Sequence, residues 1–270
     1  MTLPDVPWIV ITDLDGTMLN HHTYDFEAAR TALVRCRQRG VPVILNTSKT
    51  YAETIEIRKQ LGIDDPFIVE NGSGIYYPLD KFADRYGGTR DDYREVICGC
   101  KQEEISDVLG KISTPADHYI RLSQCSVEQC IELTGLSAEQ AENAIGRDFS
   151  EPLIWQGDDE QLQAFIRELE RHCLTTLQGG RFLHVIGECN KGTSSQQVRQ
   201  AFGNSTRIIA LGDSPNDMAM LAVADIACIV NSPSSEKLAQ LVQADIKTSQ
   251  QAPDGWVEAI DRAFGMIDQL

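Results

Sequence analysis

The chain lacks the features that mark several common classes of protein. Its 270 residues contain no apolar run of about 18 residues, the length that a helix needs to span a bilayer. The N-terminus shows no basic region followed by an apolar stretch and a small-residue cleavage site. Internal repeats and low-complexity tracts are also absent. We therefore expect a globular protein of the cytoplasm, with neither a membrane span nor a secretory signal.

The sequence also lacks closely spaced pairs of cysteines and has few basic residues. The eight cysteines stand without the C-x-x-C spacing of a zinc site, so we expect reduced thiols. Only 24 Lys and Arg oppose 40 Asp and Glu, and the formal charge of −16 repels phosphate backbones and anionic lipids. Nucleic acid and membrane partners are therefore not expected. A small anionic substrate stays possible because a metal ion and a few cations can reverse the field inside one cleft.

The first third of the chain alternates between two patterns. Apolar runs at residues 8–11, 41–45 and 66–69 are typical of buried strands, and apolar residues recur with a helical period at 24–39 and 51–61. Strands that alternate with helices predict a parallel sheet. Such sheets bind ligands at the carboxyl ends of their strands, so the polar stretches that follow each run become candidates for a site.

The middle of the chain departs from this pattern. Residues 83–187 combine helices with short apolar segments; the expected helices are 101–111, 126–132, 137–146 and 158–173, and the segments are 153–155 and 182–186. Afterwards the first pattern resumes, with a helix at 191–202, a strand at 206–211, a helix at 217–222 and a strand at 226–230. We predict an α/β fold in which residues 1–82 and 188–270 form a Rossmann-like parallel-sheet core, with residues 83–187 inserted as an α+β cap domain.

Two carboxylates follow the first strand. Alternation along the chain puts Asp13 and Asp15 on one side of the strand end, with Leu14 opposite. The two negative side chains repel each other, and a divalent cation bound between them would relieve this repulsion. The competing interpretation is structural, because Asp15 and Gly16 also suit a turn after a strand.

A second acidic stretch, Gly212-Asp213-Ser214-Pro215-Asn216-Asp217, follows another apolar strand and opens a helix. Asp213 or Ser214 would also serve as a plain helix N-cap before a proline. Two acidic strand ends on one rim favour chemistry instead: Asp13, Asp15 and Asp213 are predicted to hold Mg²⁺ through hard oxygen ligands. Asp217 is predicted to support them without contacting the metal.

Carboxylates in this arrangement suit phosphoryl transfer. With one oxygen of Asp13 on the metal, the other attacks a phosphorus atom and forms an aspartyl phosphate. Asp15 then protonates the leaving oxygen and afterwards activates the hydrolytic water.

The phosphoryl oxygens in such a reaction need preorganised donors. Thr47 or Ser48 would supply a hydroxyl, and either Lys191 or Lys49 would supply the positive charge. Both lysines open helices, so each would equally suit a solvated position.

Four motifs resemble, in the same order, those of the haloacid dehalogenase-like phosphatases. They are Asp13-x-Asp15-Gly16-Thr17, Thr47-Ser48-Lys49, Lys191-Gly192 and Gly212-Asp213-Ser214-x-Asn216-Asp217. The position of the insertion is similar to that in the class whose α/β cap is shared by sucrose-phosphatase and Cof-like enzymes. Further segments resemble the mannosyl-3-phosphoglycerate phosphatase family, and these are residues 45–50, 68–72, 133–137, 179–184 and 253–256.

This resemblance implies a reaction and a set of roles. The reaction is the hydrolysis of mannosyl-3-phosphoglycerate to mannosylglycerate and phosphate in compatible-solute synthesis, with Mg²⁺ as cofactor. Asp13 is implied as the nucleophile and Asp15 as the acid/base. The implied metal ligands are Asp13, Asp213 and the backbone carbonyl of Asp15, while Thr47 and Lys191 hold the phosphoryl group and Asp217 supports them.

The remaining candidates are expected to bind the substrate, and they are Ser48, Lys49, Asn71, Gly72, Arg181, His184 and Asn216. Strand alternation puts Phe182 and His184 on one face and Arg181 and Leu183 on the other, so at most one of Arg181 and His184 reaches the ligand unless a turn intervenes.

Three other functions stay open at this point. They are a phosphatase for another sugar phosphate, such as glucosyl-3-phosphoglycerate or sucrose phosphate, a sugar phosphomutase, and a non-enzymatic phospho-accepting signalling module. No motif distinguishes sugar epimers, because they differ in one hydroxyl orientation.

Overall fold

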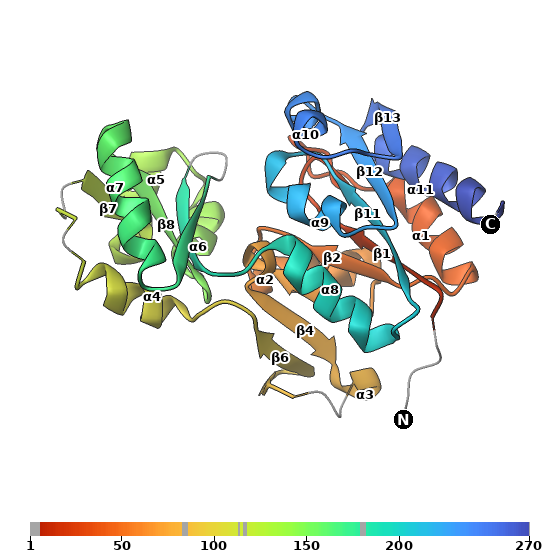
Figure 1. Cartoon of the computed structure of the whole chain (residues 1–270), viewed down its shortest axis with the longest axis horizontal. Helices are drawn as coiled ribbons and strands as arrows, with labels where there is room; N and C mark the ends of the chain where they lie inside the picture. Colours follow the sequence, from red (N-terminus) through yellow and green to blue (C-terminus); the bar gives the residue numbers. More distant parts are fainter. Residues whose placement is uncertain (1–5, 83–85, 113, 116–117, 179–181, 270) are drawn as a thin grey trace.

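The structure is a computed structural model that describes residues 6–82, 86–112, 114–115, 118–178 and 182–269. Within these ranges, nine strands form one sheet in the order β13-β12-β11-β1-β2-β3-β4-β6-β5 (Figure 1). Their bounds are β1 Trp8–Thr12, β2 Val43–Asn46, β3 Phe67–Val69, β4 Gly74–Pro78, β5 Gly88–Arg90, β6 Tyr93–Ile97, β11 Arg207–Gly212, β12 Ile226–Asn231 and β13 Ile246–Gln251. The strands from β13 to β3 are parallel, as predicted, whereas β4, β6 and β5 extend the sheet antiparallel.

Helices cover both faces of the parallel strands. Val10 packs toward α1 and α11, while Ile9 and Ile11 pack toward α8, α9 and α10. Because both faces are covered, the strands are apolar throughout rather than alternating. The helices around this sheet are α1 Ala29–Gln38, α2 Tyr51–Leu61, α3 Leu79–Phe82, α8 Lys191–Phe202, α9 Met218–Ala222, α10 Ser235–Leu241 and α11 Asp254–Ile267, with short 3₁₀ turns η1 Glu70–Gly72 and η4 Pro215–Asp217.

The first helix is shorter than predicted. It begins at Ala29 rather than at Tyr24, because the residues before it form turns. Asn20 Oδ1 accepts hydrogen bonds from the backbone N–H groups of His22 and Thr23, and Tyr24 has a φ of 57° that no right-handed helix contains.

A second, four-stranded antiparallel sheet has the order β7-β8-β10-β9. Its strands are β7 Tyr119–Arg121, β8 Ser150–Trp155, β9 Leu174–Gln178 and β10 Leu183–Gly187, and its helices are α4 Gln102–Leu109, α5 Val127–Thr134, α6 Ala138–Ile145 and α7 Asp159–Glu170, with η3 Leu122–Gln124. We call residues 98–187 the four-stranded unit. The predicted α/β fold, with a parallel-sheet core and a second small sheet of α+β character, is confirmed.

The predicted boundary at residue 83 precedes a hairpin, β5 and β6, that belongs to the nine-stranded sheet. Strands β5 and β6 pair with the nine-stranded sheet, and the Tyr76 hydroxyl donates to Glu95 Oε1 at 2.7 Å. The hairpin is half exposed and carries few apolar residues, so its sequence resembles the region that follows it. We propose residue 98 as the start of the insertion.

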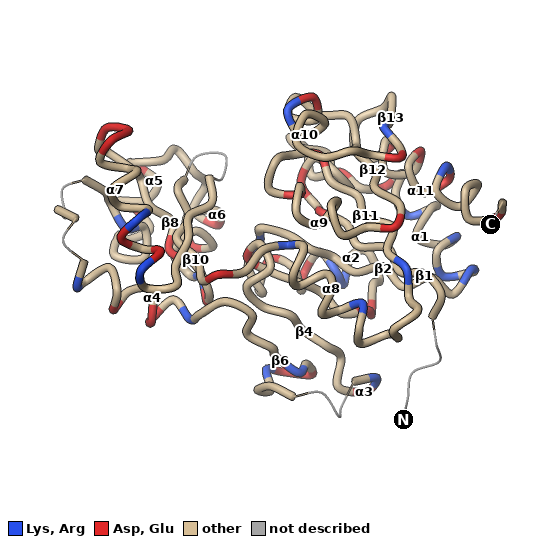
Figure 2. The backbone as a smooth tube through the Cα atoms, viewed as in Figure 1, with Lys and Arg blue, Asp and Glu red and all other residues tan. Residues whose placement is uncertain are grey.

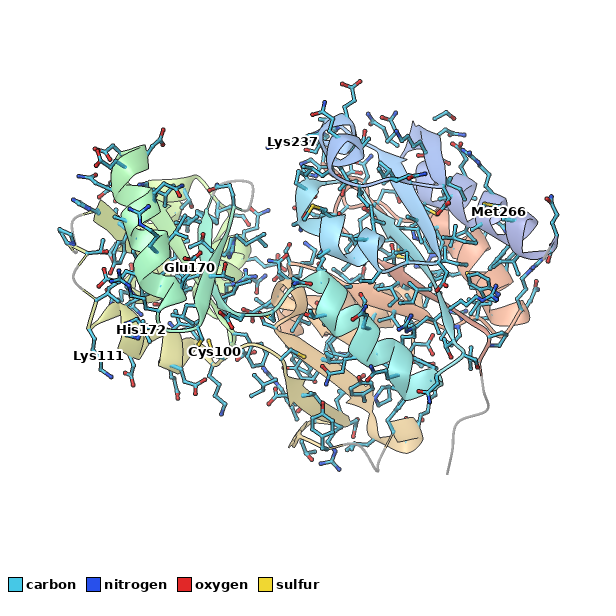
Figure 3. All side chains as sticks on the ribbon, in the orientation of Figure 1. Cys100, Lys111, Glu170, His172, Lys237 and Met266 are labelled. Atoms are coloured by element: carbon cyan, nitrogen blue, oxygen red, sulfur yellow. The ribbon has the colours of Figure 1, made fainter. Side chains whose placement is uncertain are left out.

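Two connections join the sheets, and they lie side by side. A Cβ added to Gly187 would approach the backbone nitrogen of Cys100 to 2.7 Å. Figure 3 labels Cys100. Figure 2 shows that acidic and basic residues are spread over both the nine-stranded part and the four-stranded unit. In the described ranges, no helix combines the length and the hydrophobicity that a transmembrane span needs.

Candidate active site

The strand ends gather the predicted catalytic residues. Asp13 follows β1, Thr47 follows β2 and Asp213 follows β11, and all three side chains are buried. The Asp13 N–H donates to the carbonyl of Leu211 at 3.0 Å, and this hydrogen bond joins the end of β1 to the end of β11. The topology therefore brings together segments that are about two hundred residues apart.

Lys191 lies at the centre of the site and is about 1% exposed. Its Nζ donates to Asp13 Oδ1 and to Asp217 Oδ1, each at 2.7 Å. Burial alone would lower the pKa of Lys191, but the charges of Asp13 and Asp217 outweigh it and raise that pKa above its ordinary value. Lys191 is therefore a fixed cation, and the alternative of a solvated helix-start lysine is wrong.

The position of Lys191 follows from the start of α8. Asn190 Oδ1 accepts from the N–H groups of Gly192 and Thr193, both at 2.9 Å, and so caps the helix. On the opposite side, Asn46 Nδ2 donates to the Lys191 carbonyl at 2.9 Å. The lysine backbone is thus held by both the helix cap and the end of β2.

Three carboxylates lie close enough to share a cation. Asp13, Asp213 and Asp217 each offer an oxygen within 4.8 Å of the others. Burial raises the pKa of Asp13, with Lys191 opposing, and burial together with the charge of Asp217 raises the pKa of Asp213 to about 7. A hard divalent cation would offset the mutual repulsion of three buried carboxylates that lie this close together, so the donor set fits Mg²⁺.

Asp217 is already held at both oxygens. One accepts from Lys191, and Oδ2 accepts from the backbone N–H groups of Asp213 at 3.0 Å and of Ser214 at 3.2 Å. This supports the predicted role of Asp217 as a residue that orients the others.

Gly16 permits the close approach of Asp213. Its φ is +80°, and an added Cβ would lie 2.6 Å from Asp213 Oδ2. Thr17 Oγ1 donates to Asp213 Oδ1 at 3.0 Å from the same turn. The turn after β1 and the carboxylate site are therefore one structure, and the two interpretations of this stretch are compatible.

The Asp15 carboxylate stands apart from the three-aspartate group. Its Oδ2 lies 2.9 Å from Lys49 Nζ, and its Oδ1 is buried without a hydrogen-bond partner in the described part of the chain. Burial lowers the pKa of Lys49, but Asp15 outweighs this effect and raises it. The Asp15 carboxylate therefore lies outside the group of three aspartates that could share a cation.

The predicted hydroxyl and amide groups surround this centre. Thr47 is buried, and its hydroxyl accepts from the Lys49 N–H at 3.1 Å. The Asn71 N–H donates to the Thr47 carbonyl at 2.9 Å. Asn216 Nδ2 donates to Asn71 Oδ1 at 3.4 Å, and its Oδ1 accepts from the Ser214 hydroxyl.

Of the predicted substrate residues Arg181 and His184, His184 lies on β10, whereas Arg181 lies outside the described residues. His184 lies on the face opposite to Leu183 and Val185, as alternation predicts. Burial, with a smaller effect of Arg147, lowers the pKa of His184 to about 3, so its ring is neutral. Its Nδ1 has no hydrogen-bond partner in the ranges that the structure covers.

Sequence reasoning missed Arg147 and Glu70, which link the four-stranded unit to the strand ends. Arg147 donates through Nη2 to the Ser48 carbonyl, and its Nε lies 3.5 Å from Glu70 Oε2. The buried Glu70 also accepts from the Asp148 N–H at 2.9 Å and from the Ser150 hydroxyl at 2.5 Å. No local pattern reveals this contact, because only the fold brings the two segments together.

Gly72 lies too close to the segment before α8 to accept a side chain. Its φ is +102°, and an added Cβ would lie 2.4 Å from the carbonyl oxygen of Asn190, just before Lys191. We expect Gly72→Ala to destabilise the fold by about 3 kcal/mol through strain and overpacking, measured by urea unfolding. Gly135→Ala is the matched control, since its φ is +68° with nothing within 4 Å; equal losses would contradict the steric argument.

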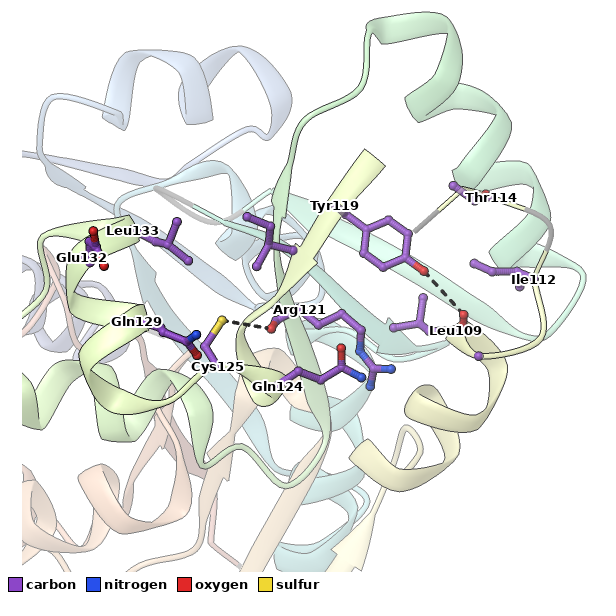
Figure 4. Close-up of a pocket in the computed structure, with 12 residues that line it drawn as sticks. Leu109, Ile112, Thr114, Tyr119, Arg121, Gln124, Cys125, Gln129, Glu132 and Leu133 are labelled. Carbon is purple, nitrogen blue, oxygen red and sulfur yellow. Dashed lines mark hydrogen bonds between the residues drawn. The ribbon is translucent and has the colours of Figure 1, made fainter. Parts of the chain in front are cut away.

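A separate cavity of about 800 Å³ lies within the four-stranded unit (Figure 4). It is lined by residues of α4, β7 and α5, and the Tyr119 hydroxyl in its wall donates to the Leu109 carbonyl at 3.5 Å. None of the predicted catalytic residues lines it, so the strand-end cluster is the candidate active site.

Comparisons with known proteins agree with this geometry. Residues 10–260 match the haloacid dehalogenase-like hydrolase family, and the chain belongs to that family. It is 34% identical over 270 residues to a glucosyl-3-phosphoglycerate/mannosyl-3-phosphoglycerate phosphatase of Persephonella marina, covering 97% of this chain and 98% of the relative. The chain is a phosphoric monoester hydrolase of this family.

Two solved structures share the fold. A phosphatase of the haloalkanoate superfamily from Bacteroides thetaiotaomicron superposes with a TM-score of 0.70 at 17% identity, covering 95% of this chain and 94% of that one. A sugar phosphatase of subclass IIB superposes with a TM-score of 0.63 at 16% identity, covering 97% of this chain and 99% of that one.

Proposed function

We propose that the chain hydrolyses mannosyl-3-phosphoglycerate, and its glucosyl analogue, to the glycosylglycerate and phosphate. The observation that carries this proposal is the full-length similarity to the Persephonella marina phosphatase, whose name includes both substrates. The gathered Asp13, Lys191 and Asp213 supply the residue types that phosphoryl transfer needs. The similarity spans both the catalytic core and the four-stranded unit, so it covers the part expected to set specificity.

Asp13 is the nucleophile in this proposal. One carboxylate oxygen attacks phosphorus, the bond from phosphorus to the leaving oxygen breaks, and Asp15 transfers a proton to that oxygen. Water then attacks the aspartyl phosphate, its proton passes to Asp15, and the bond between phosphorus and Asp13 breaks. Asp15 is suited to both transfers because its Oδ1 carries no hydrogen bond among the described residues.

Thr47 and Lys191 hold the phosphoryl oxygens, and Asp217 keeps Lys191 in place. Mg²⁺, when held by Asp13, Asp213 and the Asp15 carbonyl, supplies positive charge that offsets the phosphoryl oxygens. Ser48, Lys49, Asn71, Gly72, Asn216, Arg181 and His184 remain proposed substrate residues.

A substrate panel tests the proposal. Phosphate release is measured with mannosyl- and glucosyl-3-phosphoglycerate, sucrose phosphate and glucose 6-phosphate, before and after chelation of divalent metal. We expect kcat/KM to be highest for the glycosyl-3-phosphoglycerates, because the relative acts on them, and we expect chelation to remove activity that Mg²⁺ restores.

The same panel separates the alternatives. A preference for simple hexose phosphates would refute the substrate assignment. Phosphoryl transfer to a second sugar without phosphate release would indicate a phosphomutase, and a stable phosphorylated chain without turnover would indicate a signalling module.

A further inference from the structure

Two buried polar side chains, Thr12 and Trp256, lie next to the proposed nucleophile on the face of the sheet that packs toward α1 and α11. Strand alternation puts Thr12 on the same face as Val10 and Leu14, which belong to the same apolar cluster as Trp256. Thr12 and Trp256 are both 0% exposed. A hydroxyl buried among apolar side chains needs partners within the protein, so its hydrogen bonds have to be accounted for.

The Thr12 hydroxyl connects α11 to the backbone of Asp13. Trp256 Nε1 donates to Thr12 Oγ1 at 3.0 Å, and Thr12 Oγ1 donates to the Asp13 carbonyl at 2.8 Å. The direction of both bonds is fixed, because an indole N–H can only donate and a hydroxyl has one hydrogen to give. The Asp13 N–H is bound as well, to the Leu211 carbonyl at 3.0 Å. The peptide groups on both sides of this aspartate are therefore held.

The segment 253–256, which the proposed function does not use, places Trp256 at the start of α11. A Cβ added to Gly255 would lie 2.2 Å from the Gln250 carbonyl oxygen and 2.9 Å from Val230 Cγ1. A residue with a side chain would therefore push the helix start away from β12 and β13. Figure 1 shows α11 beside α1, on the side of the sheet that Thr12 faces. Gly255 thus lets the indole reach the end of β1.

We propose that Thr12 and Trp256 are positioning residues for the Asp13 carboxylate. Thr12 fixes the carbonyl of Asp13, and Trp256 fixes the Thr12 hydroxyl. The Asp13 side chain is thereby directed to the point where its Oδ1 meets Lys191 Nζ at 2.7 Å. A reacting group displaced by about 1 Å loses up to about 10²-fold in rate. The inference rests on the proposed function, in which Asp13 attacks phosphorus, and both residues act through Asp13 rather than on the substrate.

The test compares Thr12→Val, which removes the hydroxyl, with Thr12→Ser, which keeps it. We measure kcat and KM on the phosphate ester that the wild-type enzyme hydrolyses best, together with the midpoint of urea unfolding. Both variants are expected to lower the midpoint, because valine leaves the buried indole N–H unpaired and serine removes a buried methyl group. Only Thr12→Val is expected to lower kcat, by about tenfold, with KM within about twofold. A merely structural role would make kcat follow the midpoint in both variants.

Trp256→Phe removes the donor to Thr12 and is expected to lower kcat about threefold, since the hydroxyl keeps its bond to Asp13 but is no longer fixed. Trp155→Phe is the matched control: the Trp155 Nε1 on β8 has no hydrogen-bond partner among the described residues, so kcat is expected to stay unchanged.

A kcat within twofold of wild type in Thr12→Val, or an equal fall in Thr12→Ser, would overturn the positioning role. A best substrate other than a glycosyl-3-phosphoglycerate would overturn the proposed substrate alone. Retained turnover in Asp13→Asn would overturn the nucleophile and, with it, this inference.

Discussion

Asp13→Asn is expected to lower phosphate release by at least about 10⁴-fold, because an amide cannot attack phosphorus. The fold is expected to persist, since asparagine keeps the shape of the side chain. Burial, opposed by the charge of Lys191, raises the pKa of Asp13 above its ordinary value, so the substitution removes a negative charge that burial penalises. Lys191 keeps its second partner, Asp217, at 2.7 Å.

The measurement is initial-rate phosphate release at saturating glycosyl-3-phosphoglycerate, with urea unfolding as the check on stability. Asp107→Asn makes the same chemical change at an exposed position on α4 and is expected to leave both values unchanged. Retention of a tenth or more of wild-type turnover in the Asp13 variant would refute the covalent mechanism.

The parallel strands and several helices were predictable because their signals are local. Helix α2 has the predicted bounds: Thr50 and Glu53 form a capping box at its start, and Gly62 ends it with a φ of 64°. Helix α8 also has the predicted bounds, because Asn190 caps it and Gly203 ends it.

Some strands and helices were not predicted from the sequence. The hairpin of β5 and β6 is half exposed, so neither alternation nor a continuous apolar run marks it. Helix α11 was not predicted, although its buried residues recur with a helical period. One of them, Trp256, donates through Nε1 to Thr12 Oγ1 at 3.0 Å, and Thr12 is the residue before Asp13.

The candidate site was predictable in its residue types but not in its pairings. Strand-end motifs indicated Asp13, Asp213 and Lys191 because the ends of parallel strands share an edge. The Asp15–Lys49 ion pair and the contact between Glu70 and Arg147 depend on side-chain reach across segments. Such contacts follow from packing, which no spacing along the chain encodes.

Lys191→Met is expected to destabilise the fold most among the substitutions considered. Methionine fills a similar volume but leaves Asp13 and Asp217 without the cation that now lies 2.7 Å from each. Breaking a buried ion pair on one side costs about 3–5 kcal/mol, measured by urea unfolding in the presence of a chelator. Turnover is expected to fall at least about 10²-fold, because a donor to the phosphoryl oxygens is lost.

Lys49→Met is the control for Lys191→Met, because it also removes a lysine charge but breaks an ion pair that is less buried. Among the described residues, Lys49 forms an ion pair with Asp15, whose side chain is 28% exposed and so keeps contact with water. Its loss is expected to cost about 1 kcal/mol. Added Mg²⁺ should recover part of the stability of Lys191→Met, since the unpaired carboxylates gain a cation, but should recover little turnover, since the lysine donor stays absent. Equal destabilisation in the two variants would contradict the larger contribution to stability that we expect from the buried ion pairs of Lys191.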